Sequence, residues 1–546
     1  MRNVETRTTW IPGSRRSLST ASRSVASRSP RLEPRATKAR VISAGYSPRL
    51  ALKVLTGVAL ALIVAGPARA DLVQLTSSPR GSRLAREAGG EQLARELRIW
   101  RIPTYAVHEL RTAGVVRRAE PERLFASTGF LETATDPLVG TEWWRPVIGA
   151  DRQAPPGPGK PVTIVDSGVD FTHPEFSGRA NTSVLNEQTT TDENEDHGTE
   201  VASVLGAPNN GIGLVGVYPD ARLNLWDASP FGFLNEGAAI QGIVEAAHRG
   251  PGVINLSFGG EENDPMLADA ISLAFRSGSL VVAAAGNEGL EGSPPNFPAF
   301  YPHVLTAGAT NDNGSVAAFS SISPFVDLAA PGARIPVAEP LAQDPSGYAL
   351  ASGTSFSAPL VAGTAAWIWT RRPDLDHTQL FELMRRSATD IGVRGFDNAS
   401  GAGLLNIPAA LGLKAPTRDP QEPNEKPNEI EPNGVFATGT SPLTQPGRRN
   451  ALLSARVERN EDPLDLYRAW APGGMTLQAR VKGSVTVRIL QRFLQPRGNS
   501  AKPLGVGKHG LVRYANKSRR GVYVYVEVRP SVRMAEYTLR LTAARR

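Results

Sequence analysis

Hydrophobic positions follow two different patterns along the chain, on either side of a polar stretch near residue 420. From 138 to about 413, short runs rich in Val, Ile and Ala are almost continuously apolar and alternate with helix-like segments. Strands of that kind are buried on both faces, as in a parallel sheet covered by helices. We therefore predict an α/β, doubly wound parallel sheet, whose sites lie at the carboxyl ends of strands. The predicted strands lie in VTIVD (162–166), RLNLWDA (222–228), GVINLSF (252–258), LVVAAAG (280–286) and VLTAGAT (304–310).

Residues 434–546 instead alternate apolar and polar positions in many short runs. VTVRIL (485–490), VYVYVEV (522–528) and YTLRLTA (537–543) are examples. This alternation predicts an antiparallel β-sandwich. The stretch that separates the two patterns, 414–433, is rich in Pro and Glu without periodicity, which predicts an extended linker.

Residues 71–137 have the pattern of a small α+β unit that precedes the main domain. Apolar spacing predicts helices at Glu91–Arg98 and Val107–Thr112. Trp100–Val107 and Val115–Arg118 are predicted to be extended.

The first 70 residues contain one apolar run, Val54–Ala65, preceded by Arg49 and Lys53 and followed by an A-x-A sequence that ends at Ala70. These features predict a basic leader and a secretory signal peptide cleaved after Ala70. The alternative is a membrane anchor, but the run is shorter than the roughly 20 residues that a spanning helix needs. We expect a secreted protein.

The formal net charge of +8 conceals three unequal parts. Residues 1–70 carry +11, residues 71–433 carry −18 and residues 434–546 carry +15. A uniformly basic nucleic-acid binder would not divide in this way, so we expect no nucleic-acid partner. The chain has no cysteine, which excludes disulfides, thiolate metal sites and a cysteine nucleophile.

Three polar side chains fall at the ends of predicted elements. VDSGVDFTHPEF places Asp166 at the end of a buried strand, DHGTEVASVLG places His197 at the start of a helix, and ASGTSFSAPLVAG places Ser355 at the start of another. Serine becomes a nucleophile when a base removes its proton, and that base needs a carboxylate to hold its tautomer. Together the three residues supply these roles.

A stabiliser for the negative charge that develops on an attacked carbonyl is also present. AAAGNEG ends a buried strand and presents Asn287, whose side-chain N–H groups can donate to an oxyanion. The backbone N–H of Ser355, at a helix N-terminus, can be the second donor.

The motifs DSGVD, HGTEVAS, AAAGNEG and GTSFSAP resemble, in the same order, the Asp, His, Asn and Ser motifs of the subtilisin-like (subtilase, peptidase S8) serine peptidases. The resemblance covers roughly 138–413. It implies a subtilisin-like fold and a serine-type endopeptidase that acts on protein or peptide substrates through an acyl-enzyme, with no cofactor for catalysis. Within NLSFGG it implies that Ser257 and Gly259 line one wall of the P1 pocket and pair with the substrate backbone. The other wall would consist of Ala284, Ala285 and Gly286.

The chain departs from the family at three positions. The family usually has HGTHVAG after the catalytic His, whereas this chain has Glu200 and Ser203. Asn296 stands where many relatives keep a glycine at the base of the P1 pocket, which leaves the P1 preference open. In the following FPAFYP segment, the resemblance implies a cis peptide at Phe297–Pro298.

The loop APNNGIGLVGVYP resembles the calcium-binding loop of bacterial subtilisins. The resemblance implies side-chain oxygens from Glu175 and Asn210 and carbonyls from Pro208, Ile212 and Leu214, an all-oxygen set that suits a structural Ca²⁺. The alternative is a polar turn without an ion.

Two accessory parts are implied as well. Residues 71–137 would be a pro-segment that assists folding and then acts as an intramolecular inhibitor, with a processing site within 126–141; the alternative is a retained accessory domain. EPNGVFAT (431–438) and the stretch that begins DPLDLYRAW resemble the pre-peptidase C-terminal domain of secreted bacterial peptidases. Its basic charge leaves open either contact with an anionic surface, with cell-surface association, or a solvated face.

The sequence thus predicts five segments: a basic leader and signal peptide (1–70), a pro-segment (71–137), a subtilisin-like catalytic domain (138–413), a linker (414–433) and a β-sandwich (434–546). Two alternatives to an endopeptidase are a non-catalytic scaffold on a degenerate protease fold and a surface adhesin that cleaves only itself. The first would need a missing catalytic group, and all four are present.

Overall fold

The computed structural model describes residues 70–122, 126–127, 130–133, 139–189, 196–230, 232–419, 421–424, 442–491, 503–506 and 509–545. The predicted leader and signal peptide, up to residue 69, and the EPNGVFAT motif lie outside these residues. Within the described part, no helix combines the length and the apolar character needed to cross a membrane.

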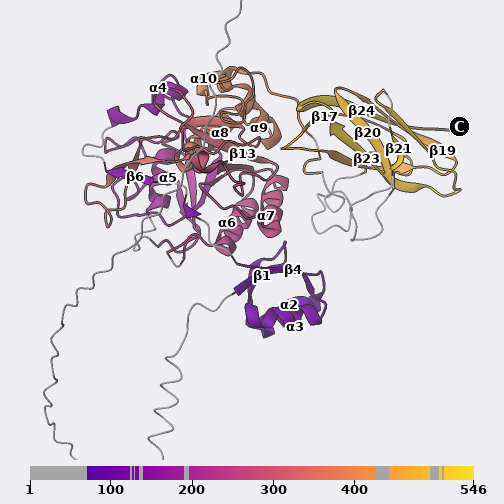
Figure 1. Ribbon diagram of the computed structural model, residues 1–546, viewed down its shortest axis with the longest axis horizontal. Coiled ribbons are helices and arrows are strands. Elements are labelled where there is room, and N and C mark those ends of the chain that lie inside the picture. The colour runs from indigo at the N-terminus through magenta and orange to yellow at the C-terminus, as the bar shows by residue number, and fades with distance from the viewer. Residues whose placement is uncertain are drawn as a thin grey trace, which may run out of the picture. The chain divides into compact units, whose positions relative to one another are not determined.

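Residues 70–122 form a four-stranded antiparallel sheet with two helices on one side (Figure 1). The strand order is β2-β3-β1-β4. Val73, Trp100 and Ile102 of the sheet pack against Val107 and Leu110 of the second helix. The elements are β1 (Ala70–Leu75), α2 (Pro79–Glu87), β2 (Glu91–Ala94), β3 (Ile99–Pro103), α3 (Thr104–Thr112) and β4 (Val116–Pro121).

The predicted helix at Glu91–Arg98 is wrong, because its first residues form strand β2. The helix lies earlier, as α2, where the Ser78 side chain accepts a hydrogen bond from the backbone N–H of Arg80. The chain then reverses at Gly89, which has a positive φ of 78°. Leu93 and Leu97 have the four-residue spacing of a helix and are both buried. Leu93, however, lies in strand β2, and Leu97 lies in the turn after it.

The main domain contains a seven-stranded parallel sheet in the order β14-β13-β12-β10-β7-β9-β8. All of its pairings are parallel, which confirms the predicted fold class. The strands are β7 (Pro161–Asp166), β8 (Thr182–Val184), β9 (Arg222–Asp227), β10 (Val253–Leu256), β12 (Leu280–Ala284), β13 (Val304–Thr310) and β14 (Leu328–Pro331).

Helices cover both faces of this sheet, because its apolar strands direct successive side chains to opposite sides. In β12, Val282 and Ala284 pack into the core that contains α5 and α8, whereas Val281 and Ala283 pack into the core that contains α6 and α7. Figure 1 labels these helices around the sheet. Their bounds are α4 (Trp144–Ile148), α5 (His197–Gly206), α6 (Glu236–His248), α7 (Pro265–Arg276), α8 (Thr354–Arg371), α9 (His377–Arg386) and α10 (Ile407–Gly412).

Two small sheets join the predicted processing region to the catalytic domain. Strand β5 (Ala126–Ser127) pairs antiparallel with β11 (Phe258–Gly259). Strand β6 (Phe130–Thr133) pairs antiparallel with β16 (Tyr348–Ser352), which also pairs with β15 (Ile335–Ala338). The chain around residues 126–133 is therefore bound to strands near both Ser257 and Ser355.

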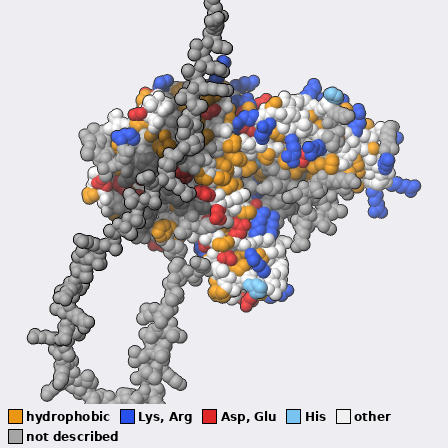
Figure 2. Space-filling view, viewed as in Figure 1, with side chains coloured by type: hydrophobic (Ala, Val, Ile, Leu, Met, Phe, Trp, Pro, Cys, Tyr) orange, Lys and Arg blue, Asp and Glu red, His pale blue; other side chains and the backbone are white. Residues whose placement is uncertain are grey.

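The C-terminal domain consists of two four-stranded antiparallel sheets, β17-β24-β19-β22 and β18-β23-β20-β21, in agreement with the predicted sandwich. Their inner faces share one core that includes Val457, Tyr467, Ile489 and Leu539. Lys and Arg side chains gather over this domain in Figure 2. The strands are β17 (Asn450–Glu458), β18 (Asp465–Ala471), β19 (Met475–Lys482), β20 (Val485–Gln491), β21 (Pro503–Val506), β22 (Leu511–Ala515), β23 (Val522–Pro530) and β24 (Met534–Arg545).

Candidate active site

Asp166 and His197, which the sequence predicts to act together, are joined by a buried hydrogen bond. Asp166 is the last residue of β7 and His197 the first of α5. His197 Nδ1 lies 2.7 Å from Asp166 Oδ1, and both side chains are almost completely buried. Burial lowers the pKa of His197, but the Asp166 carboxylate more than offsets this effect and the net pKa is raised.

The close approach of α5 to the end of β7 depends on Gly198. A Cβ atom at this position would lie 1.9 Å from the carbonyl oxygen of Ser167. Because glycine has no Cβ, the chain can approach closely here, and the Gly198 N–H donates to Ser167 Oγ at 2.7 Å. The glycine of the HGT motif therefore allows the imidazole to reach the carboxylate.

Ser355 is the second residue of α8, and the ring of its neighbour Phe356 lies 6.0 Å from the imidazole of His197. Its hydroxyl, however, donates to the carbonyl oxygen of Ser257 at 3.0 Å. His197 Nε2 is buried and has no hydrogen-bond partner among the described residues. The structure thus joins two of the three predicted groups, and the predicted Ser–His hydrogen bond is not formed in this rotamer. Such bonds often form only with substrate present.

Asn287 follows β12 and is held by the residue before Ser355. Thr354 donates to Asn287 Oδ1 through its backbone N–H at 2.9 Å and through Oγ1 at 3.0 Å. A planar amide whose oxygen faces Thr354 must direct its Nδ2 donors elsewhere. Sequence reasoning missed this role of Thr354, although the residue lies inside the GTSFSAP motif that it used.

The five predicted wall residues lie at or just after the ends of β10 and β12, which are neighbours in the sheet. Ser257 follows β10 and precedes β11, and its Oγ donates to the Ser355 carbonyl at 2.9 Å. Asn296 lies between the walls, since its Nδ2 donates to the Ala284 carbonyl at 3.2 Å and a Cβ on Gly259 would lie 2.2 Å from Asn296 Oδ1. The remaining members, Ala285 and Gly286, continue from β12. The Phe297–Pro298 peptide bond is cis, as the resemblance implied.

The Glu200 side chain, which replaces the family's histidine, is buried against a second carboxyl group. Glu200 lies one turn after His197, and its carboxyl group is hydrogen-bonded to that of Glu339, which follows β15. Ser203, the other departure in this motif, accepts from the Ala338 N–H at 2.9 Å and so binds α5 to the same strand end. Two carboxyl groups in such contact must share a proton, because one of them has to donate.

Burial and like charge raise the pKa values of both acids. Burial is the main cause for Glu200, whose pKa lies well above its usual range, and Asp196 and Glu339 add repulsion. The pKa of Glu339 is raised to about 7, again mainly by burial, with repulsion from Asp196 and Asp344. Sequence reasoning noted Glu200 but missed Glu339, since no local pattern connects two residues so far apart.

At the predicted calcium ligands, protein groups donate to one oxygen of Glu175 and to the side-chain oxygen of Asn210. Glu175 Oε1 accepts from the Leu214 N–H at 2.7 Å and from the Tyr348 hydroxyl at 3.2 Å. Asn210 Oδ1 accepts from the Ile212 N–H at 2.8 Å. Glu175 Oε2 is buried and has no hydrogen-bond partner among the described residues, so Ca²⁺ binding here, with the carbonyl of Pro208, and the alternative of a polar turn both stay predictions.

Comparison with known proteins identifies relatives of this chain. The model of the subtilase family (Peptidase_S8) matches residues 157–403. The chain is 35% identical over 257 residues to Subtilisin BL of Lederbergia lenta, covering 46% of this chain and 91% of that protein. It is 35% identical over 255 residues to Subtilisin NAT of Bacillus subtilis subsp. natto, covering 46% of this chain and 65% of that protein.

Among solved structures, fervidolysin from Fervidobacterium pennivorans, described as a keratinolytic enzyme related to subtilisin, has a similar fold. The TM-score is 0.54 at 21% sequence identity, and the match covers 84% of this chain and 70% of that chain.

Proposed function

Because this chain belongs to the subtilase family of serine endopeptidases, we propose that it is a secreted endopeptidase in which Ser355, His197 and Asp166 form the catalytic triad. The observation that carries this proposal is the buried hydrogen bond of 2.7 Å between His197 and Asp166. It leaves His197 Nε2 as the basic nitrogen, because Nδ1–H is bound to the carboxylate.

In the first step the Ser355 hydroxyl rotates from the Ser257 carbonyl to His197 Nε2. The imidazole accepts the proton while Ser355 Oγ attacks the carbonyl carbon of the substrate. The Asp166 carboxylate stabilises the imidazolium that forms. Its effect on the pKa of His197 supports this role.

The negative charge on the attacked oxygen is stabilised by the Asn287 side chain and the Ser355 N–H. The two hydrogen bonds from Thr354 to Asn287 Oδ1 support this assignment, because they fix the orientation of the amide. The imidazolium then protonates the leaving amine, and the acyl-enzyme remains. Water, deprotonated by the same imidazole, hydrolyses the ester and restores Ser355. No step passes through a metal ion or a cofactor.

Substrates would bind as a strand beside Ser257–Gly259, with the P1 side chain between that wall and Ala284–Gly286. The antiparallel pairing of β5 with β11 supports this mode, since a segment of the chain itself occupies the same strand edge. The position of Asn296 between the walls favours small P1 side chains.

The same pairings support residues 71–137 as the pro-segment and intramolecular inhibitor. Ser127 pairs with Phe258, and Phe130 pairs with Ser352 just before the α8 helix. We place the processing cleavage at a bond between Ser127 and Phe130, within the predicted window. Mass spectrometry of the exported protein would then give a new N-terminus at residue 128, 129 or 130, and would also locate signal cleavage after Ala70.

Proteolysis of an unrelated protein tests the function. The purified protein should hydrolyse casein, and Ser355→Ala should abolish this activity. Ser357→Ala is the matched control, because this hydroxyl lies in the same motif but donates to the carbonyls of Ala330 and Pro331. Processing of the chain without casein hydrolysis would favour the self-cleaving adhesin, and a wild-type protein without either activity would favour the scaffold.

A further inference from the structure

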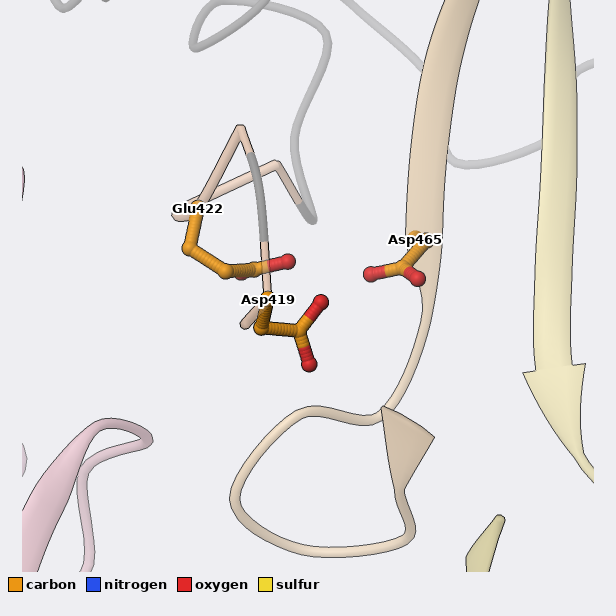
Figure 3. Close-up of side chains that lie close together, drawn as sticks. All are labelled: Asp419, Glu422 and Asp465. Atoms are coloured by element: carbon orange, nitrogen blue, oxygen red, sulfur yellow. The ribbon is translucent and has the colours of Figure 1, made fainter. Parts of the chain in front are cut away.

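Three acidic side chains from two parts of the chain converge at the start of the sandwich. Asp419 and Glu422 lie on a turn in the predicted linker, and Asp465 is the first residue of β18. Figure 3 shows the three carboxyl groups directed toward one another. Each offers an oxygen, and these oxygens all lie within 4.8 Å of one another.

Protein donors bind one oxygen of each of these acids. Asp419 Oδ2 accepts from the Arg456 N–H at 2.9 Å, and Glu422 Oε1 accepts from Asn424 Nδ2 at 2.7 Å. Asp465 Oδ2 accepts from the hydroxyls of Tyr467, at 3.0 Å, and Tyr537. These bonds hold the carboxyl groups in fixed orientations.

The second oxygen of Asp419 is the feature that points to a ligand. Asp419 is only 5% exposed, and its Oδ1 has no hydrogen-bond partner among the described residues. The carboxyl group is aimed at the other two acids (Figure 3). A buried carboxylate oxygen without a donor is costly unless a positive charge compensates it.

Two basic side chains lie near this group. Arg456 Nη2 lies 3.9 Å from Asp419 Oδ2, and His303 Nε2 lies 4.0 Å from Glu422 Oε2. Acidic residues are scarce in this basic domain, yet four of the six in 434–546 fall between 458 and 465. A small cavity of about 30 Å³ lies beside them, lined in part by Asp419, Glu422 and Glu461. This volume accommodates a water molecule.

We propose that Asp419, Glu422 and Asp465 bind a hard divalent cation of the Ca²⁺ class. Calcium takes oxygen ligands at about 2.3–2.6 Å, so oxygens on one ion lie up to roughly 5 Å apart, which matches the spacing of this group. Water from the adjacent cavity completes the coordination. The ion compensates the unpartnered oxygen of Asp419 and lies between two buried acids, Asp419 and Asp465, and the half-buried Glu422.

The bound ion fastens the linker to the sandwich. The turn at 421–424 already bonds to β18, since the Leu466 N–H donates to Asn424 Oδ1 at 2.7 Å. Asp419 is also bonded to the catalytic domain. Its backbone N–H donates to Oγ1 of Thr378, a residue of α9, at 3.2 Å. Binding of the cation therefore orders the connection between the two domains.

The test uses the full chain carrying Ser355→Ala, which prevents digestion during the measurement. After removal of metals with EDTA, calorimetric titration with CaCl₂ at neutral pH should reveal a site with a dissociation constant of roughly 10⁻⁶–10⁻³ M. Thermal unfolding should move to higher temperature with Ca²⁺. D419N and E422Q, which replace an oxygen ligand by an amide, should weaken binding by about a hundredfold or more, since even partners outside the ligand set contribute 10–100-fold.

Two control variants identify the site. Asp374→Asn changes an exposed acid of the same domain junction and should leave binding unchanged. Glu175→Gln removes the acid of the loop that resembles a calcium site, and it should also leave this binding event intact. The proposal fails if the parent chain shows neither heat nor stabilisation up to about 10 mM CaCl₂, above the range of extracellular calcium modules. It also fails if E422Q and D419N bind as the parent does.

Discussion

Two of the regions in which buried acids gather, beside the active site and at the linker, differ in what compensates the acids. Beside the active site, Glu200 and Glu339 are hydrogen-bonded to each other, so a proton on one carboxyl group is bound by the other. At the linker, Asp419 and Glu422 are bonded to separate protein donors, and Asp419 directs an oxygen into the space between the acids. Two carboxyl groups that touch can share a proton, whereas three groups that surround a point form a ligand set.

The largest expected effect comes from replacing Asp166, the acid that is hydrogen-bonded to His197. Asp166→Asn should lower kcat about 10⁴-fold, because an amide does not hold the imidazole in the required tautomer. Steady-state cleavage of a peptide substrate measures this loss. The same variant should retain the response of its unfolding temperature to Ca²⁺. A loss of that response would contradict the view that the active site and the linker acids act independently.

The Asn296 side chain, which lies between the pocket walls, should affect the specificity for the P1 residue rather than the overall rate. Asn296→Gly should raise kcat/KM for substrates with Phe at P1 by roughly tenfold or more, since a side chain is removed from the pocket base. The value for Ala at P1 should change little, which makes the substrate pair its own control. Equal changes for both substrates would contradict the position of Asn296 in the pocket.

The shared proton at Glu200 and Glu339 predicts a stability that depends on pH. The pKa of Glu339 is raised from 4.5 to about 7, so the folded chain binds more protons than the unfolded chain between these values. Stability from this pair is present below about pH 4.5 and is lost as the pH rises through about 7. Asp196 and Asp344, which also face the pair, add to the repulsion.

Glu339→Gln should remove this loss, because an amide can donate to Glu200 at any pH. On the Ser355→Ala background, its unfolding temperature should exceed that of the parent by a few degrees in alkaline buffer and converge with it in acid. The exposed Glu291→Gln is the control. Parallel curves for E339Q and the parent at all pH values would show that the two carboxyl groups do not share a proton.

The smallest effect on rate is expected at the linker. Asp419→Asn should leave kcat unchanged on a short peptide substrate, because it touches no group of the triad. Initial rates in the presence and absence of EDTA check this. A fall comparable to that of Asp166→Asn would mean that the linker acids support the active site directly.

The sequence predicted the catalytic region far better than the linker, for a physical reason. Asp166, His197 and Ser355 each lie in a short motif whose local structure, a strand end or a helix start, fixes the side chain. By contrast, the prediction of an extended linker at 414–433 gave no residue there a buried position, whereas Asp419 and Asn424 are buried. Composition indicates which residues prefer water, but not which of them fold back onto a distant strand.

Within the active site, the remaining surprises have the same origin. The rotamer of the Ser355 hydroxyl depends on the Ser257 carbonyl, and the protonation of Glu200 depends on Glu339, both far away in the chain. The wrong prediction of a helix at Glu91–Arg98 has a related cause. The apolar residues there have helical spacing, but a strand and the turn after it bury them. Long-range contacts decided each of these cases.

The pairing of β5 with β11 has a consequence for the timing of activation. While the two strands belong to one polypeptide, occupancy of the cleft does not depend on how dilute the protein is. Once the connection is cut, the released piece becomes an ordinary ligand that dissociates more completely as the solution is diluted. If residues 71–137 are the inhibitor, as proposed, export into a large volume would favour its dissociation and so activate the enzyme, whereas a small compartment would keep it bound.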